Sequence, residues 1–90
     1  DLYERAQIYL ENSLKLNKND AQTYLLLAQV YCWQDKFVKA KGLLDTAIKL
    51  NPSFSQAYRD RGYIWHNQKQ YSKAIEDLEK AHILNKEDLD

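Results

Sequence analysis

Residues 24–52, YLLLAQVYCWQDKFVKAKGLLDTAIKLNP, contain two amphipathic segments joined by a short turn. Apolar residues recur in the first segment with the spacing of one face of an α-helix, at Tyr24, Leu27, Ala28 and Tyr31. The second segment carries the same kind of stripe, at Phe37, Ala40, Leu44, Ala47 and Ile48. Small alanines opposite large side chains allow two helices to approach closely, so this stretch predicts a helix–turn–helix hairpin.

The hairpin recurs along the chain at a fixed interval. A forward shift of 34 residues places Tyr24 on Tyr58 and Phe37 on Tyr71. The same shift backwards places Phe37 on Tyr3. The matches fall mainly on the apolar stripes, whereas the polar positions differ. Self-similarity of this kind, at this period, indicates a helical repeat protein.

With these residues in place, the chain resembles the tetratricopeptide repeat (TPR) family, whose unit is a helix–turn–helix. In residues 21–54 the resemblance is carried by Tyr24, Leu27, Ala28, Tyr31, Phe37, Ala40, Leu44, Ala47 and Leu50-Asn51-Pro52. In residues 55–88 it is carried by Tyr58, Gly62, Trp65, Tyr71, Ala74, Leu78, Ala81 and Leu84-Asn85. Two positions depart from the pattern: Arg61 stands where the family prefers Leu, and Lys86 stands where Pro closes the unit.

The resemblance implies an all-α fold, an α-α superhelix (TPR solenoid) of five antiparallel helices. We expect one domain over residues 1–90: the second helix of a truncated repeat (1–20) and two full repeats (21–54 and 55–88). Helices are predicted at about 1–17, 21–34, 37–50, 55–67 and 71–84, followed by a linker over 86–90. Because the chain begins in the middle of a unit, we expect it to be a fragment of a longer protein.

Two pairs of polar residues have the spacing of a helix capping box, in which a side chain before the helix and one a turn later satisfy free backbone amides. The pairs are Asn19 with Gln22, and Ser53 with Gln56. Their separation equals the repeat period, so we expect both to cap the first helix of a repeat.

Composition argues against several functions. The formal net charge is +0, and no Lys/Arg-rich face is apparent, so we expect no nucleic-acid partner. No run of about 18 apolar residues exists, so we expect no membrane partner. Cys32 is the single cysteine, which excludes an internal disulfide and favours a reducing compartment such as the cytoplasm.

The chain offers no pattern typical of catalysis. It has no nucleophile paired with a base, no paired carboxylates in a recognisable cleft and no glycine-rich phosphate loop. His66 and His82 have no third ligand at metal-binding spacing. We therefore expect no enzyme activity, no catalytic residue, no cofactor and no metal site.

The TPR resemblance implies that a partner binds the concave face, which the first helix of each repeat lines. The residues expected there, outside the core stripe, are Gln22, Leu25, Leu26, Gln29, Trp33, Arg59, Tyr63 and His66. They would form a groove with an apolar and a polar end, suited to a peptide with one hydrophobic anchor. By residue type, Trp33, Arg59 and Tyr63 are expected to contribute most. Alternatively, Leu25, Leu26 and Trp33 pack against a helix that this chain lacks.

One TPR subclass holds the carboxylate end of chaperones with Lys and Asn side chains from successive first helices. The flank of residues 22–29 carries no Lys or Arg, and Asp60 beside Arg59 would repel a carboxylate. We expect that this clamp is absent from these repeats.

The leading hypothesis is therefore a scaffold or adaptor that binds a protein or peptide partner through the groove. A second hypothesis is self-association through the open ends of the array, because stacked repeats expose apolar end faces. A third is the non-catalytic targeting domain of a larger enzyme or co-chaperone. The repeat pattern itself does not choose between them, since one fold serves many functions.

Overall fold

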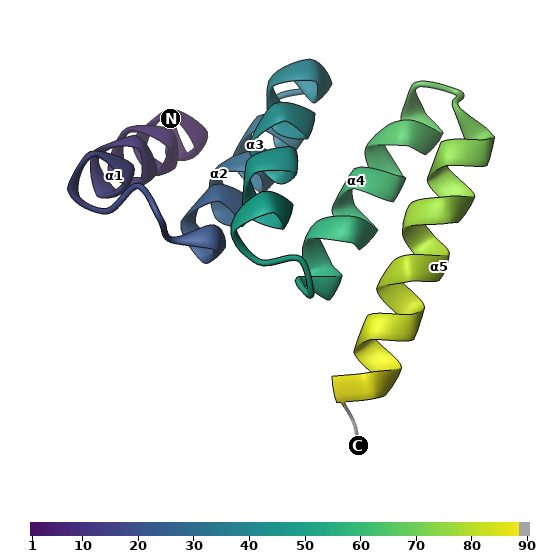
Figure 1. The fold of residues 1–90 in the computed structure, drawn as a ribbon. Helices are drawn as coiled ribbons and strands as arrows, with labels where there is room; N and C mark the ends of the chain where they lie inside the picture. Colours follow the sequence, from purple (N-terminus) through teal and green to yellow (C-terminus); the bar gives the residue numbers. More distant parts are fainter. Residues whose placement is uncertain (89–90) are drawn as a thin grey trace.

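The computed structural model describes residues 1–88, and within them the chain forms five helices joined by short turns (Figure 1). The helices are α1 (Leu2–Leu16), α2 (Ala21–Trp33), α3 (Phe37–Leu50), α4 (Ser55–Asn67) and α5 (Tyr71–Asp88). Each helix packs against the next, and α2 also contacts α4, the equivalent helix of the following repeat. The predicted all-α helical repeat is confirmed, and the predicted bounds of the first four helices agree with the structure to within about a residue.

The C-terminal end of α5 differs from the prediction. A linker was expected from Lys86 onwards, but the helix continues to Asp88. In the preceding repeat, α3 ends at Leu50 because Pro52 disfavours helical geometry in the residue before it. Lys86 occupies the corresponding position in α5 and imposes no such limit. The last two residues of the predicted linker lie outside the described part of the chain.

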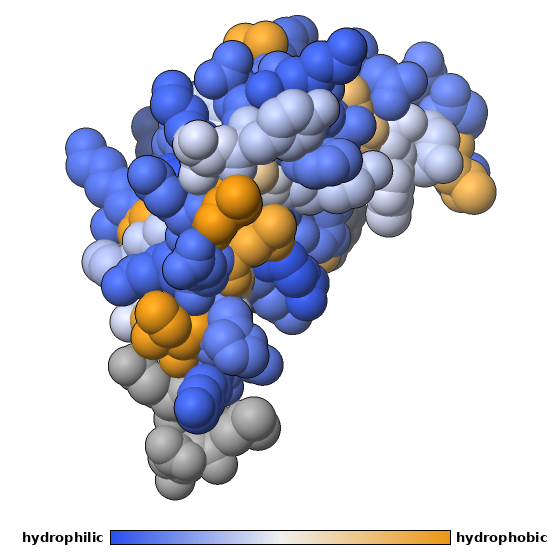
Figure 2. Space-filling view, turned by 90° about the vertical axis from the view of Figure 1, so that its right-hand side faces the viewer, coloured by the Kyte–Doolittle hydropathy of each residue, from blue (hydrophilic) through white to orange (hydrophobic). Residues whose placement is uncertain are grey.

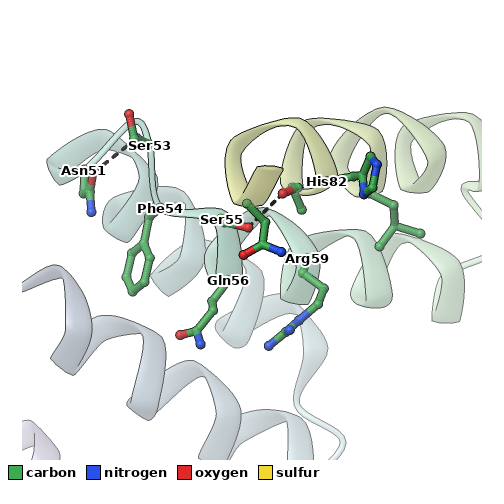
Figure 3. A pocket seen from close by; sticks show the side chains of 10 residues that line it. Asn51, Ser53, Phe54, Ser55, Gln56, Arg59 and His82 are labelled. Atoms are coloured by element: carbon green, nitrogen blue, oxygen red, sulfur yellow. Dashed lines mark hydrogen bonds between the residues drawn. The ribbon is translucent and has the colours of Figure 1, made fainter. Parts of the chain in front are cut away.

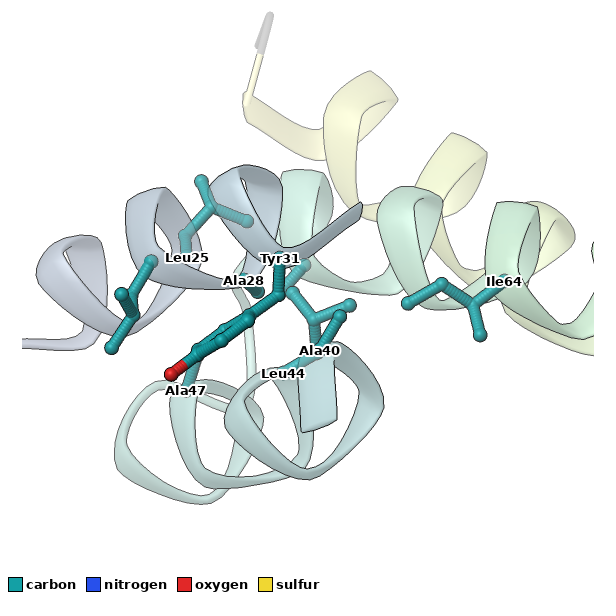
Figure 4. Close-up of a cluster of buried hydrophobic side chains, with 9 residues drawn as sticks. Leu25, Ala28, Tyr31, Ala40, Leu44, Ala47 and Ile64 are labelled. Atoms are coloured by element: carbon teal, nitrogen blue, oxygen red, sulfur yellow. The ribbon is translucent and has the colours of Figure 1, made fainter. Parts of the chain in front are cut away.

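The core lies between α2 and α3 and continues towards α4 (Figure 4). Its buried members are Leu25, Leu27, Ala28, Tyr31, Ala40, Leu44, Ala47, Ala57 and Ile64. Ala40 and Ala47 expose no surface at all, because α2 and α3 approach closely at these small side chains. The predicted stripes thus form the core, as large residues against small ones.

The turns that end α2 and α4 share one geometry. Asp35 and Lys69 both adopt left-handed backbone, with φ of 60° and 63°. In the first turn the Lys36 N–H donates to the Tyr31 carbonyl at 2.9 Å, and in the second the Gln70 N–H donates to the Trp65 carbonyl at 2.8 Å. These are Schellman caps, in which glycine usually takes the left-handed position.

The caps observed at the starts of α2 and α4 differ from the predicted capping boxes. Asp20, rather than Asn19, caps α2: its carboxylate accepts from the Gln22 N–H at 3.1 Å. Helix α4 begins after Phe54 without a side-chain cap. What recurs is an asparagine one residue after a helix: the Asn51 side chain accepts from the Ser53 N–H at 3.2 Å. At the equivalent position 34 residues earlier, directly after α1, the Asn17 side chain accepts from the Asn19 N–H.

Arg61 joins three helices. Its guanidinium, on α4, donates to both carboxylate oxygens of Asp77 on α5, at 2.7 and 2.8 Å. It also donates to Asp45 on α3 at 3.1 Å. The hydrogen bond to Asp77 is the main cause that raises the pKa of Arg61 above its ordinary value. The residue that departs from the Leu pattern of the repeat is therefore held by two carboxylates, one on each neighbouring helix.

Candidate functional site

A cavity of about 470 Å³ lies between the C-terminal halves of α2 and α4. We call it the α2/α4 cavity. Its lining consists of Gln29, Cys32, Trp33, Asp35, Phe37, Asp60, Tyr63 and Asn67. The two helices contribute matching positions, because a shift of 34 residues places Gln29 on Tyr63 and Trp33 on Asn67. The repeat therefore brings two equivalent helix faces to one hollow.

Three of the predicted binding residues meet in this cavity: Gln29, Trp33 and Tyr63. Trp33 and Tyr63 remain 63% and 59% exposed, so each offers an aromatic surface to a ligand. Gln22 and Leu26 are exposed on α2 at helical spacing before Gln29, outside the cavity lining. They lie on the same helix face, since residues three, four and seven apart share a face.

The other predicted residues lie elsewhere. Leu25 is 1% exposed within the core and cannot present its side chain to a partner, so its assignment to the site was wrong. Leu25 lies outside the α2 stripe but belongs to the same buried cluster as Ala57 and Ile64 of α4. Arg59 lines a different hollow. His66 packs edge-on against the ring of Tyr71, at 5.5 Å between centroids, and does not line the cavity.

Sequence reasoning missed two lining residues, Asp35 and Phe37. Asp35 was assigned to a turn and Phe37 to the core stripe. The Schellman cap after α2 folds the chain back so that both border the end of that helix. A glycine-free turn next to an exposed Trp was the available signal, but the left-handed backbone of Asp35 cannot be derived from residue type alone.

Two contacts fix the walls of the cavity. The Gln29 side-chain amide donates to Asp60 at 3.0 Å, which links α2 to α4. The ring of Trp33 lies 5.6 Å from that of Tyr3 on α1, with a tilt of 44°. Aromatic pairs at this distance stabilise each other, so Tyr3 holds one side of the Trp33 ring in place.

Cys32 lines the cavity as a partly buried thiol. Burial raises the pKa of Cys32 to about 11, and the charge of Asp60 contributes. Since the thiolate is the reactive form, this thiol is a poor nucleophile and metal ligand near neutral pH. Among the described residues there is no group of three or more His, Cys, Asp or Glu that could hold a metal ion. Nor is any described helix long and apolar enough to cross a membrane.

A second hollow, of about 540 Å³, lies between the turn that follows α3, the start of α4 and the C-terminal half of α5. Gln56 and Arg59 project into it from α4, and His82 borders it on α5 (Figure 3). The Ser55 hydroxyl donates to the Ala81 carbonyl at 2.8 Å beneath it. On the α5 side, Figure 2 shows apolar patches between hydrophilic side chains, and Ile75, Leu78 and Ile83 are among the exposed apolar residues.

Comparison with known sequences gives a family. Residues 4–89 match the family model for the tetratricopeptide repeat protein 21 C-terminal ARM domain. The chain is 34% identical over 83 residues to tetratricopeptide repeat protein 21B of Homo sapiens. That match covers 86% of this chain and 6% of the human protein, so the chain spans a small part of its relative's length.

Solved structures give the same fold. MamA superposes with a TM-score of 0.92 at 24% identity, over 99% of this chain and 52% of that one. The second TPR of Spaghetti (RPAP3), bound to the HSP90 peptide SRMEEVD, superposes with a TM-score of 0.87 at 26% identity, over 91% of this chain and 76% of that one. The fold is thus a TPR-like helical repeat, and the chain belongs to the family of the tetratricopeptide repeat protein 21 C-terminal ARM domain.

Proposed function

We propose that the chain is a protein-interaction module that binds a peptide segment of a partner protein in the α2/α4 cavity. One observation carries the proposal: Trp33 and Tyr63, from two different helices, line one cavity and both remain mostly exposed. Trp and Tyr are the residue types that most often dominate the binding energy of interfaces. Two such residues on packed helices form a rigid apolar site next to polar groups.

Preorganisation supports this proposal. Trp33 is held by Tyr3, and the two helices are linked by the hydrogen bond between Gln29 and Asp60. A site whose side chains are already fixed loses less conformational entropy when a ligand binds. Leu26 and Gln22, exposed before Gln29 on α2, extend the surface along the helix. A peptide that follows α2 would therefore contact both parts.

The similar structure of Spaghetti (RPAP3) with its bound HSP90 peptide gives independent support, because a related array there holds a peptide. The chemistry at the present cavity differs from a carboxylate clamp. Its lining holds Asp35 and Asp60, and none of its members is a Lys or Arg. We therefore propose a peptide partner without proposing this chaperone tail as the ligand.

The test is a selection of binding peptides from a random octapeptide library, followed by fluorescence anisotropy with the purified chain. Trp33→Ala and Tyr63→Ala should each weaken binding of the selected peptides about tenfold or more. The control is Val38→Ala, because Val38 is exposed on α3 and does not line the cavity. Unchanged affinity in both aromatic variants, with a native circular dichroism spectrum, would contradict the proposal.

Self-association is a second candidate, supported by the exposed apolar residues of α5. Ile75, Leu78 and Ile83 border a shallow hollow on this helix together with Glu79 and His82. Unpartnered apolar faces at the ends of repeat arrays tend to associate. Light scattering over a range of concentrations tests this candidate: a constant monomer mass of the chain and of an Ile75→Glu variant would exclude it.

A further inference from the structure

We propose that the α2/α4 cavity is selective for a basic peptide and accepts a Lys or Arg side chain of the partner. This inference rests on the proposed function, since it names the chemistry of the ligand that the same cavity would hold. Three properties of the cavity support it: its aromatic walls, its carboxylates and the helix ends that border it.

Three aromatic residues line the cavity: Trp33, Phe37 and Tyr63. The faces of aromatic rings carry partial negative charge and attract cations, most strongly for Trp. Clusters of such rings recognise ammonium and guanidinium groups in many proteins. A neutral apolar ligand would also pack on these rings, so the aromatic walls alone do not decide the charge of the ligand.

The charged groups of the lining indicate that the ligand carries a positive charge. The lining holds the carboxylates of Asp35 and Asp60, and within the described part of the chain none of its members is Lys, Arg or His. Gln29 donates one hydrogen bond to Asp60, which leaves the carboxylate with further acceptor positions. Arg59 forms an ion pair with the other oxygen of Asp60, but its Nε lies 3.8 Å away, beyond hydrogen-bond distance. Asp60 therefore retains capacity for a ligand cation.

The C-terminal ends of two helices add to the negative electrostatic potential of the two carboxylates. Helix α2 ends at Trp33 and α4 ends at Asn67, and both residues line the cavity. The C-terminal end of a helix carries partial negative charge, equivalent to about half an elementary charge. Both ends border the hollow and add negative potential there, although their Tyr31 and Trp65 carbonyls already accept hydrogen bonds in the Schellman turns. A cation gains from this potential, whereas a ligand carboxylate would be repelled by it and by the two Asp side chains.

A cavity selective for a basic peptide would differ in ligand preference from the similar structure that holds an acidic peptide. The peptide SRMEEVD carries three acidic residues towards its C-terminus. At the α2/α4 cavity such a segment would bring carboxylates against Asp35 and Asp60. We expect the reverse preference here, with binding that weakens as salt concentration rises because the attraction is partly electrostatic.

Four small probes test the preference: N-acetyl methylamides of arginine, lysine, norleucine and glutamate. Norleucine has the four-carbon side chain of lysine without its ammonium group. Each is titrated into the ¹⁵N-labelled chain while the indole N–H signal of Trp33 is followed by NMR. We expect the arginine and lysine probes to shift this signal with an affinity about five- to tenfold higher than that of norleucine, and glutamate to leave it unchanged.

Asp60→Asn provides the decisive variant, since an asparagine oxygen can still accept the bond from Gln29 while the charge is lost. It should reduce the preference for arginine over norleucine towards onefold. The matched control is Glu76→Gln, which removes an exposed carboxylate on α5 outside the cavity and should leave the preference intact. The dispersion of the NMR spectrum reports that each variant is folded.

The remaining outcomes overturn the inference. If norleucine or glutamate binds as well as arginine, the cavity does not select a cation, although the proposed function stands. If no probe shifts the Trp33 signal, the inference also fails, and the library selection then decides the proposed function by itself. A preference for arginine that survives in Asp60→Asn would locate the cation site elsewhere and contradict the assignment.

Discussion

Arg61 on α4 binds both carboxylate oxygens of Asp77 on α5, with Nε 2.7 Å from one and Nη2 2.8 Å from the other. Asp77 is 6% exposed, so its charge is compensated mainly by this guanidinium. The position of Arg61 is one at which TPR-like sequences prefer Leu. The chain thus joins the two helices of its last described hairpin by an ion pair rather than by apolar packing alone.

The first prediction concerns this pair. Arg61→Leu should lower the free energy of unfolding by about 3 kcal/mol, because it leaves the Asp77 carboxylate buried without its partner. The double variant Arg61→Leu/Asp77→Leu should recover most of the loss, since apolar residues of similar size replace the whole pair. Urea unfolding followed by circular dichroism measures both. A double variant as unstable as the single one would contradict this account.

The two glycines should respond oppositely to alanine. A Cβ at Gly62 would lie 3.0 Å from Leu78 Cγ and 3.2 Å from the Ala74 carbonyl oxygen, and this backbone oxygen cannot move aside easily. Gly62→Ala should therefore force α4 and α5 apart and cost about 1–3 kcal/mol. A Cβ at Gly42 meets nothing within 4 Å, so Gly42→Ala should stabilise the chain by about 0.5–1 kcal/mol. Equal changes in melting temperature for Gly62→Ala and Gly42→Ala would be evidence against this packing of α4 on α5.

Lys69 should be replaceable by glycine with a gain in stability. Its φ of 63° lies in the left-handed region, which costs a residue with a Cβ about 1–2 kcal/mol. Lys69→Gly should raise the free energy of unfolding by about 0.5–1 kcal/mol after the greater freedom of glycine in the unfolded chain is subtracted. Lys69→Ala is the control: it keeps the Cβ, so its melting temperature should stay near that of the parent chain.

Cys32 should react slowly with thiol reagents. Burial and the charge of Asp60 raise the pKa of its thiol to about 11. At pH 8 a raised pKa means less thiolate, so reaction with Ellman's reagent should be about 100-fold slower than that of free cysteine. The rate should rise as the pH approaches 11, and Asp60→Asn should increase it at pH 8 because one raising cause is removed. A rate equal to that of free cysteine would show that the thiol is not shielded.

The sequence predicted the fold well because one period governs it. Residues such as Ala40, Ala47 and Leu44 lie on stripes that recur every repeat, and all three are buried as expected. The side chains that cap the helices were harder to predict. The helix starts depend on whether Asn19 or Asp20 faces the first free amides, and one residue of shift changes the cap.

The candidate site was predictable only in part. Gln29, Trp33 and Tyr63 could be placed on one face from helical spacing, and they meet in the α2/α4 cavity. Leu25 could not be placed in this way, because it lies outside the stripe of its own helix yet is buried in a cluster that includes Ala57 and Ile64 of α4. Asp35 joins the cavity through a left-handed turn. Such long-range and conformational effects leave no periodic signal in the sequence.

The most direct test of peptide binding uses the two tryptophans of the chain as internal reporters. Trp33 lines the α2/α4 cavity, whereas Trp65 lies outside its lining, between Lys41 and Lys73 at 5.0 and 4.7 Å from the ring centroid. The measurement is a ¹H–¹⁵N NMR titration of the labelled chain with the best octapeptide from the library selection. We predict a saturable shift of the Trp33 indole signal with little change at Trp65. A saturating peptide that shifts Trp65 and leaves Trp33 unchanged would contradict the assignment of binding to this cavity.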